Sequence, residues 1–174
     1  MALAAPLNLN KWIDDHRDLL KPPVGAKTVW TDTDFMVTVV GGPNERPDYH
    51  DDPLEEFFFQ LKGDMILKVI DDGARRDIPI REGEIFLLPP HVLHSPQREA
   101  DTIGLIVERT RAAGLVDAFE WFCDACHARV HRREVQVGGL EQGVNQVLDE
   151  YNTKPELRSC AGCGHVNPGR DAPA

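Results

Sequence analysis

Two histidines and one glutamate of this chain could together hold a catalytic metal ion. His50 is followed six positions later by Glu56, and His94 comes shortly after Pro89 and Pro90. Two neutral imidazoles and one carboxylate are the donor set of a three-ligand Fe(II) site, which leaves the opposite coordination positions open for substrate and O₂. The alternative interpretation is that His50 lies in a polar surface loop and that His94 only ends a strand.

The four cysteines form a second candidate metal site. They fall into two CxxC pairs, Cys123 with Cys126 and Cys160 with Cys163, and no cysteine is left over. Two such pairs can present four thiolates at the corners of a tetrahedron, which suits zinc or iron. Because the protein would supply all four ligands, we expect a structural role; the alternative is four reduced thiols.

Short apolar runs between Val29 and Arg109 predict the scaffold that positions the first set of ligands. The runs are rich in valine, isoleucine and phenylalanine, and glycine-containing turns separate them. Many short strands at close spacing are typical of an antiparallel sandwich or barrel. The runs are FMVTVV, EFFFQLK, MILKVI, IFLL and TIGLIVE.

The segments on either side of this β region differ from it in pattern. Apolar residues at helical spacing predict one helix over residues 10–20 and a second over 139–151, with a strand over 130–137 between them. The Pro-, Gly- and Ala-rich residues 167–174 predict a frayed tail. We therefore expect two domains, a barrel with an N-terminal helix over residues 1–114 and a C-terminal extension over 115–174.

Charge and hydropathy restrict the possible partners. The formal net charge of −10 disfavours binding to nucleic acid or to an anionic membrane surface. The chain has no apolar stretch of membrane-spanning length and no signal-like N-terminus, so we expect a cytoplasmic protein without a membrane partner. Paired cysteines in a reducing compartment favour metal thiolates over disulfides.

The spacing of the first ligand set resembles the paired motifs of the cupin superfamily, H-x5-E-x6-G from His50 to Gly63 and G-x5-P-x4-H from Gly83 to His94. This resemblance implies an all-β dominated fold, a double-stranded β-helix or jelly-roll barrel that encloses one metal. Asp52 stands where cupins often carry a further histidine, which argues for three ligands rather than four.

His91 lies three residues before His94 and is a rival ligand. Residues three apart in an extended segment point to opposite faces, so only one of the two should face the barrel interior. The cupin pattern assigns that position to His94.

Two longer strings, GGPNERPDYHDDPLEEFFFQLKGDM and GEIFLLPPHVLHSPQR, with GLIVER after them, are similar to the bacterial 3-hydroxyanthranilate 3,4-dioxygenase family. The resemblance covers most of residues 22–109. It implies an Fe(II) enzyme of tryptophan degradation and quinolinate and NAD biosynthesis. Such an enzyme opens the ring of 3-hydroxyanthranilate with O₂ to give 2-amino-3-carboxymuconate semialdehyde.

The resemblance also assigns roles to particular residues. His50, Glu56 and His94 match the iron ligands of the family, and the substrate-binding residues correspond to Arg46, Arg98 and Glu108. An arginine fork can bind the carboxylate of this substrate in a bidentate way, and Glu108 could accept a proton during catalysis. For the cysteine site the resemblance implies rubredoxin-like iron, with zinc as the alternative, and for the whole chain a homodimer. The chain departs from the family at Ala26, where asparagine is common, and at Leu93, where arginine is.

Two other functions remain open at this stage. One is a cupin dioxygenase that acts on a different ring or on a thiol. The other is a non-catalytic sensor that binds a small aromatic carboxylate and uses the cysteine module to contact a partner. Loss of a metal ligand or a basic DNA-binding appendage would favour the sensor, and the sequence has neither.

Overall fold

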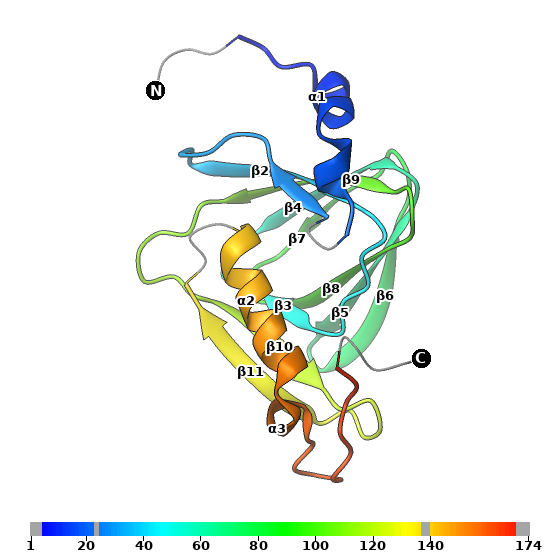
Figure 1. Cartoon of the computed structure of the whole chain (residues 1–174), viewed down its shortest axis with the longest axis vertical. Coiled ribbons are helices and arrows are strands. Elements are labelled where there is room, and N and C mark those ends of the chain that lie inside the picture. Colours follow the sequence, from blue (N-terminus) through cyan, green and yellow to red (C-terminus); the bar gives the residue numbers. More distant parts are fainter. Residues whose placement is uncertain (1–4, 23–24, 137–139, 170–174) are drawn as a thin grey trace.

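The computed structural model describes residues 5–22, 25–136 and 140–169, and within them two antiparallel sheets face each other (Figure 1). The five-stranded sheet has the order β1-β2-β9-β4-β7 and the six-stranded sheet the order β11-β10-β3-β8-β5-β6. The strands are β1 (Ala26–Thr28), β2 (Phe35–Gly41), β3 (Tyr49–Asp51), β4 (Glu56–Lys62), β5 (Met65–Asp71), β6 (Ala74–Ile80), β7 (Ile85–Leu88), β8 (Leu93–Arg98), β9 (Ile103–Arg109), β10 (Asp117–Phe122) and β11 (Arg129–Val135). The helical elements are α1 (Leu9–Asp15), η1 (Arg17–Leu20), α2 (Leu140–Thr153) and α3 (Pro155–Arg158). The predicted all-β character of the central region is confirmed.

Strand alternation determines which side chains face the interior between the sheets. In β4 the buried residues Glu56, Phe58 and Gln60 alternate with partly exposed ones, so the same pattern that forms the core also turns a carboxylate inward. The register pairs His50 of β3 with His94 of β8, and Glu56 of β4 with Glu108 of β9. Residues far apart in sequence are thus brought to one interior.

The apolar core shares that interior with the polar residues. Its buried members come from both sheets and include Phe58, Leu67 and Val69, all with exposed fractions of about 1% or less. The Asp72-Gly73 turn joins β5 to β6 with both residues at positive φ, as a two-residue hairpin requires. This hairpin sets the register that sends alternate β5 side chains into the core.

The residues after 114 continue the barrel and then cover it. β10 pairs with β3, and β11 pairs with β10, so the six-stranded sheet is extended by this part of the chain. Helix α2 lies across that sheet in Figure 1, and Tyr151 of α2 stacks on Trp121 of β10 with ring centroids 4.2 Å apart. Phe119 and Val147 complete this second core. The boundary between residues 114 and 115 stays a prediction.

The flanking elements differ in part from the expectations. The helix expected over residues 10–20 is α1 followed by the short 3₁₀ helix η1, because His16 at the end of α1 leaves helical geometry. The second expected helix is present as α2, and the expected strand as β11, although residues 137–139 lie outside the described part. No helix within the described residues is long and apolar enough to cross a membrane.

The expected fraying from residue 167 onward is wrong for its first residues. Asn167 is only 5% exposed, and its amide nitrogen donates to the carbonyl of Phe122 at 2.8 Å and to the hydroxyl of Tyr151 at 3.2 Å. Its side-chain oxygen accepts from the backbone N–H of Asp124. This asparagine ties the last described segment to β10 and α2, whereas residues 170–174 lie outside the described part.

Candidate metal centre and active-site cavity

The structure brings His50, Glu56 and His94 together in the interior. One donor atom from each lies within 4.8 Å of the other two, and all three side chains are buried. Nε2 of His94 and Oε2 of Glu56 are 2.8 Å apart, close to the roughly 3 Å between two ligands that bind one ion at about 2.1 Å and at right angles. Apart from this contact with His94, Oε2 of Glu56 has no polar partner among the described residues, so the donor set fits a three-ligand metal site.

Neighbouring side chains hold both imidazole rings. Oδ1 of Asp117 lies 2.8 Å from Nε2 of His50, and the Phe119 ring stacks on His50 with centroids 4.8 Å apart and planes 4° from parallel. Nδ1 of His94 lies 2.9 Å from the carbonyl of Val92. For His94, whose Nε2 faces Glu56, a carbonyl on the second ring nitrogen is the usual way in which a protein orients a metal-binding histidine.

Neighbouring groups lower the pKa values of two buried carboxyl groups at the site, although burial alone would raise them. Burial alone would raise the pKa of Glu56, but the nearby His94 holds it below its ordinary value. Burial would also raise the pKa of Asp117, but hydrogen bonds with His50 and Arg111 hold that pKa below its ordinary value. Both groups are therefore carboxylates at neutral pH.

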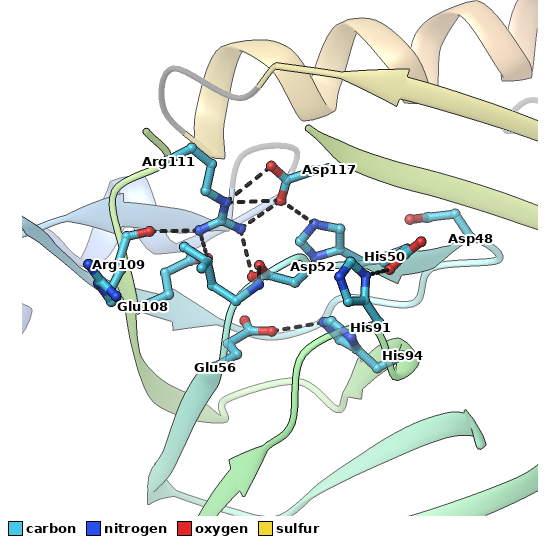
Figure 2. A network of polar contacts seen from close by, with 12 residues as sticks. Asp48, His50, Asp52, Glu56, His91, His94, Glu108, Arg109, Arg111 and Asp117 are labelled. Atoms are coloured by element: carbon cyan, nitrogen blue, oxygen red, sulfur yellow. Dashed lines mark hydrogen bonds and ion pairs between the residues drawn. The ribbon is translucent and has the colours of Figure 1, made fainter. Parts of the chain in front are cut away.

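Two rival ligands are excluded from the cluster by their positions. The His91 side chain is 68% exposed and lies against Asp51, which agrees with the expectation that only His94 faces inward. Asp52 is buried, but its Oδ2 lies 2.6 Å from Nη2 of Arg111. Figure 2 shows Asp52 directed toward this guanidinium rather than toward Glu56 and His94.

A cavity of about 570 Å³ is lined in part by His50, Glu56 and His94. Both arginines expected to bind the substrate line it. Its walls come from the barrel, from the N-terminal segment and from the C-terminal segment; Ala26, Ile106, Trp121, Asn152 and Gly169 represent the three sources. Residues that precede the barrel strands in the sequence and residues that follow them therefore both line the cavity.

The two arginines differ in how they are held. Arg98 is 2% exposed, and its Nε and Nη1 have no hydrogen-bond partner among the described residues. Burial lowers the pKa of Arg98 to about 10, with Glu56 raising it and Arg46 lowering it, so the group stays cationic at neutral pH. Arg46 is paired with Asp48 and lies over the Phe119 ring. Arg98 thus offers unpaired donors inside the cavity, as an anion-binding residue should.

Glu108 lies beside the ligands but is not part of the cavity wall. It pairs with Glu56 across β4 and β9, and its Oε2 accepts from Nη1 of Arg111 at 2.6 Å, while Oε1 is buried with no partner among the described residues. Burial, together with the charge of Glu56, raises its pKa well above the ordinary value, although Arg111 opposes this shift. The carboxyl group is thus placed near the ligands, with one oxygen free.

Sequence reasoning missed Arg111, Asp117 and Phe119. Arg111 follows the last barrel strand in the run ERTRAAG, where an arginine gives no signal of its own. Asp117 and Phe119 come from the segment DAFEWF, which contains no metal-binding motif. The pairing of β10 with β3 is what brings them to His50.

The four cysteines converge as expected from their spacing. The Sγ atoms of Cys123 and Cys163 are 3.6 Å apart, and so are those of Cys126 and Cys160. All four Sγ atoms lie within 4.8 Å of one another. Four sulfurs at about 2.3 Å from one ion form a tetrahedron with edges of about 3.8 Å, so this cluster also fits a metal.

The family model and the curated relatives name one family. The 3-HAO family, described as 3-hydroxyanthranilic acid dioxygenase, matches residues 1–152. The chain is 53% identical over 174 residues to the 3-hydroxyanthranilate 3,4-dioxygenase of Ruegeria pomeroyi, covering 99% of this chain and 97% of that one. It is 55% identical over 166 residues to the enzyme of the same name from Paraburkholderia phytofirmans, covering 95% of each. Among solved structures, a cupin-2 domain containing protein from Shewanella frigidimarina has a TM-score of 0.48 at 19% identity, covering 59% of this chain and 93% of that one.

Proposed function

The chain belongs to the 3-hydroxyanthranilic acid dioxygenase family, and from this we propose how its own residues perform ring opening of 3-hydroxyanthranilate. The reaction consumes O₂, breaks the bond between ring carbons 3 and 4, and puts both oxygen atoms into 2-amino-3-carboxymuconate semialdehyde. His50, Glu56 and His94 hold Fe(II), and the clustering of their donor atoms is the observation that carries this assignment. When bound, iron supplies the electron transfer that allows O₂ to react with the ring.

Arg98 and Arg46 bind the substrate carboxylate and thereby orient the ring. The unpaired donors of buried Arg98 support this role, since a buried cation without a partner is costly unless a ligand satisfies it. Ile106 and Val40 give the cavity an apolar wall for the ring. With the carboxylate held at the arginines, the hydroxyl and amino groups point toward the three ligands.

Glu108 accepts the proton that the substrate hydroxyl loses. Burial raises its pKa, which makes the ionised carboxylate a stronger base, and its free Oε1 is the atom that can receive the proton. Arg111, through its bond to Oε2, keeps the group in place. General-base catalysis of this kind contributes roughly 10²- to 10⁴-fold in rate.

The four-cysteine site has a structural role and holds iron or zinc. Its two pairs lie in different segments, one after β10 and one after α3, so a bound ion connects the end of the sheet to the segment that carries Asn167. All four ligands come from the protein, which leaves no open position for substrate. A cytoplasmic location stays a prediction.

A direct experiment tests the catalytic assignment. We would load the full chain anaerobically with Fe(II), add 3-hydroxyanthranilate, and follow O₂ uptake together with the absorbance of the ring-opened product. We expect one O₂ consumed per substrate, and loss of both signals with His94→Ala. Substrate binding without O₂ uptake in the iron-loaded protein would instead favour the sensor function.

We further propose that the chain forms a homodimer through the outer face of the five-stranded sheet. The N-terminal helices cover one half of this face, where Leu61 and Leu105 pack against them. The other half exposes Phe35, Ile85 and Leu87 by 57%, 64% and 55% beside a groove of about 300 Å³.

A second copy of the chain is the occupant that best fits this surface. Glu55 and Arg109 both line the groove, so a two-fold axis could pair each with its opposite in the other copy. Leu87→Asp should convert the dimer to a monomer in light-scattering measurements, because it places a charge in an apolar contact. Val116→Asp, at an exposed apolar residue elsewhere, is the matched control. A wild-type protein that is monomeric at micromolar concentration would contradict the proposal.

A further inference from the structure

Arg111 is the most highly bonded side chain near the metal centre. Its side chain is 1% exposed and makes ion pairs at 2.6 Å with three carboxylates, those of Asp52, Glu108 and Asp117. It also donates to the carbonyl of Arg109 at 2.9 Å. Figure 2 shows the guanidinium at the centre of this group, directly beside the metal ligands.

Each of these carboxylates is linked to a residue of the catalytic site. Asp52 follows His50 by two positions, so the two side chains share one side of the extended chain. Asp117 contacts His50, and Glu108 lies opposite Glu56 in the sheet. One guanidinium therefore forms ion pairs with three acidic groups, each of which lies next to a proposed metal ligand.

Two of these carboxylates are themselves possible metal ligands. Donor atoms of His50, Asp52 and Asp117 all lie within 4.8 Å of one another. The donor atoms of His50, Glu56 and His94 lie within the same limit. His50 belongs to both groups. Without another cation, an ion held by His50 would have Asp52 within reach as a further oxygen ligand.

We propose that Arg111 is a positioning residue that limits the metal to three protein ligands by holding Asp52 away from it. The inference rests on the proposed ligand set of His50, Glu56 and His94. The bond from Nη2 of Arg111 to Oδ2 of Asp52 satisfies the carboxylate with a fixed cation. The coordination positions that a fourth protein ligand would take therefore stay open for substrate and O₂.

Counting the water molecules on a bound ion tests this inference without turnover. The full chain would first be filled with zinc at the cysteine site and then loaded with Mn(II), which prefers oxygen and nitrogen ligands. Three protein ligands leave three of about six positions for water, whereas a fourth leaves two. Arg111→Met should therefore lower the enhancement of water-proton relaxation by about a third.

A double substitution separates ligation by Asp52 from a change in charge. Arg111→Met with Asp52→Asn should restore the wild-type relaxation, whereas Arg111→Met with Asp117→Asn carries the same net charge and should stay low. Arg132→Met is the control for loss of a clamping arginine, because Arg132 binds Glu120 and Asp51 in the same sheet. It should keep the wild-type value.

The inference can fail independently of the proposed function. If Arg111→Met does not fold, as circular dichroism would show, Arg111→Lys is compared with its own Asp52→Asn double variant, because one ammonium cannot reproduce the three-carboxylate clamp. Relaxation that is unchanged in the folded Arg111 variant, or equally low in both charge-matched doubles, overturns the role of Arg111. Mn(II) binding that survives His94→Ala would instead refute the ligand set itself.

Discussion

Replacing Gly104 with alanine is expected to weaken substrate binding by displacing Arg98, although neither residue is a metal ligand. Gly104 lies on β9, and a Cβ atom there would be 2.9 Å from Nη2 of Arg98 and 3.0 Å from Oε1 of Gln60. Ordinary contacts between such atoms start at about 3.5 Å, so the guanidinium must move by roughly 0.5 Å. The absence of a side chain at residue 104 is what allows Arg98 its present position.

The size of the effect follows from the hydrogen bonds that Arg98 would make to a carboxylate. A shift of about 0.5 Å stretches a bond of about 2.9 Å beyond the normal range, and a charge-assisted bond contributes about 1.5–3 kcal/mol. Losing half of the upper value costs about 1.5 kcal/mol, or roughly tenfold in KM. We expect kcat to change by less than about twofold, since the iron ligands are not displaced.

Oxygen uptake by the iron-loaded protein at varied substrate concentration measures both constants. Arg98→Ala should raise KM further than Gly104→Ala, because it removes the cation entirely. In the Arg98→Ala background the Gly104→Ala substitution should have little additional effect, as expected for two changes that act on one interaction. A tenfold rise in KM that persists in that background would refute the steric argument, and so would an unchanged KM for Gly104→Ala alone.

Three further substitutions test other parts of the site. Glu108→Gln should lower kcat by roughly 10²- to 10⁴-fold with a smaller change in KM, because it removes the proton acceptor; a change confined to KM would contradict that role. Cys160→Ser should reduce the metal content measured by elemental analysis from two ions per chain to one and lower the melting temperature, while iron at the histidine site is retained. Loss of both ions would argue against separate sites. Asn167→Ala should lower the free energy of unfolding by about 1–3 kcal/mol in denaturant titration, since it removes a buried hydrogen bond to Tyr151 and part-buried ones to Phe122 and Asp124, and an unchanged stability would show that these bonds are dispensable.

The sequence was sufficient to predict the barrel because its strands follow from local patterns, whereas the proposed ligand set came from the resemblance to the cupin motifs. Alternation along EFFFQLK predicts a strand with one buried face, and Glu56 occupies a position on that face. The histidines stand at fixed distances from glycines and prolines that form turns. Spacing and period are properties of short segments, and a single sequence contains them.

The network around Arg111 could not be predicted in this way. Its partners lie 59 positions before it and three before and six after it, and no period connects them. They meet only because β10 pairs with β3 and β9 with β4. Asn167 was missed for a different reason: composition predicts a frayed tail, whereas one buried side-chain amide with three hydrogen bonds, together with a bond from Arg158 to the backbone carbonyl of Asn167, orders the segment.

The cavity wall formed by Pro168 and Gly169 has a consequence for the order in which the protein becomes functional during synthesis. The strands that carry His50, Glu56 and His94 leave the ribosome well before these residues do, and chains begin to fold as they emerge. The ligands can therefore assemble in a barrel whose mouth is still open on the side that α2 later covers. Fewer residues then surround the cavity, so we expect ribosome-bound chains that stop before α2 to take up metal faster than the finished protein.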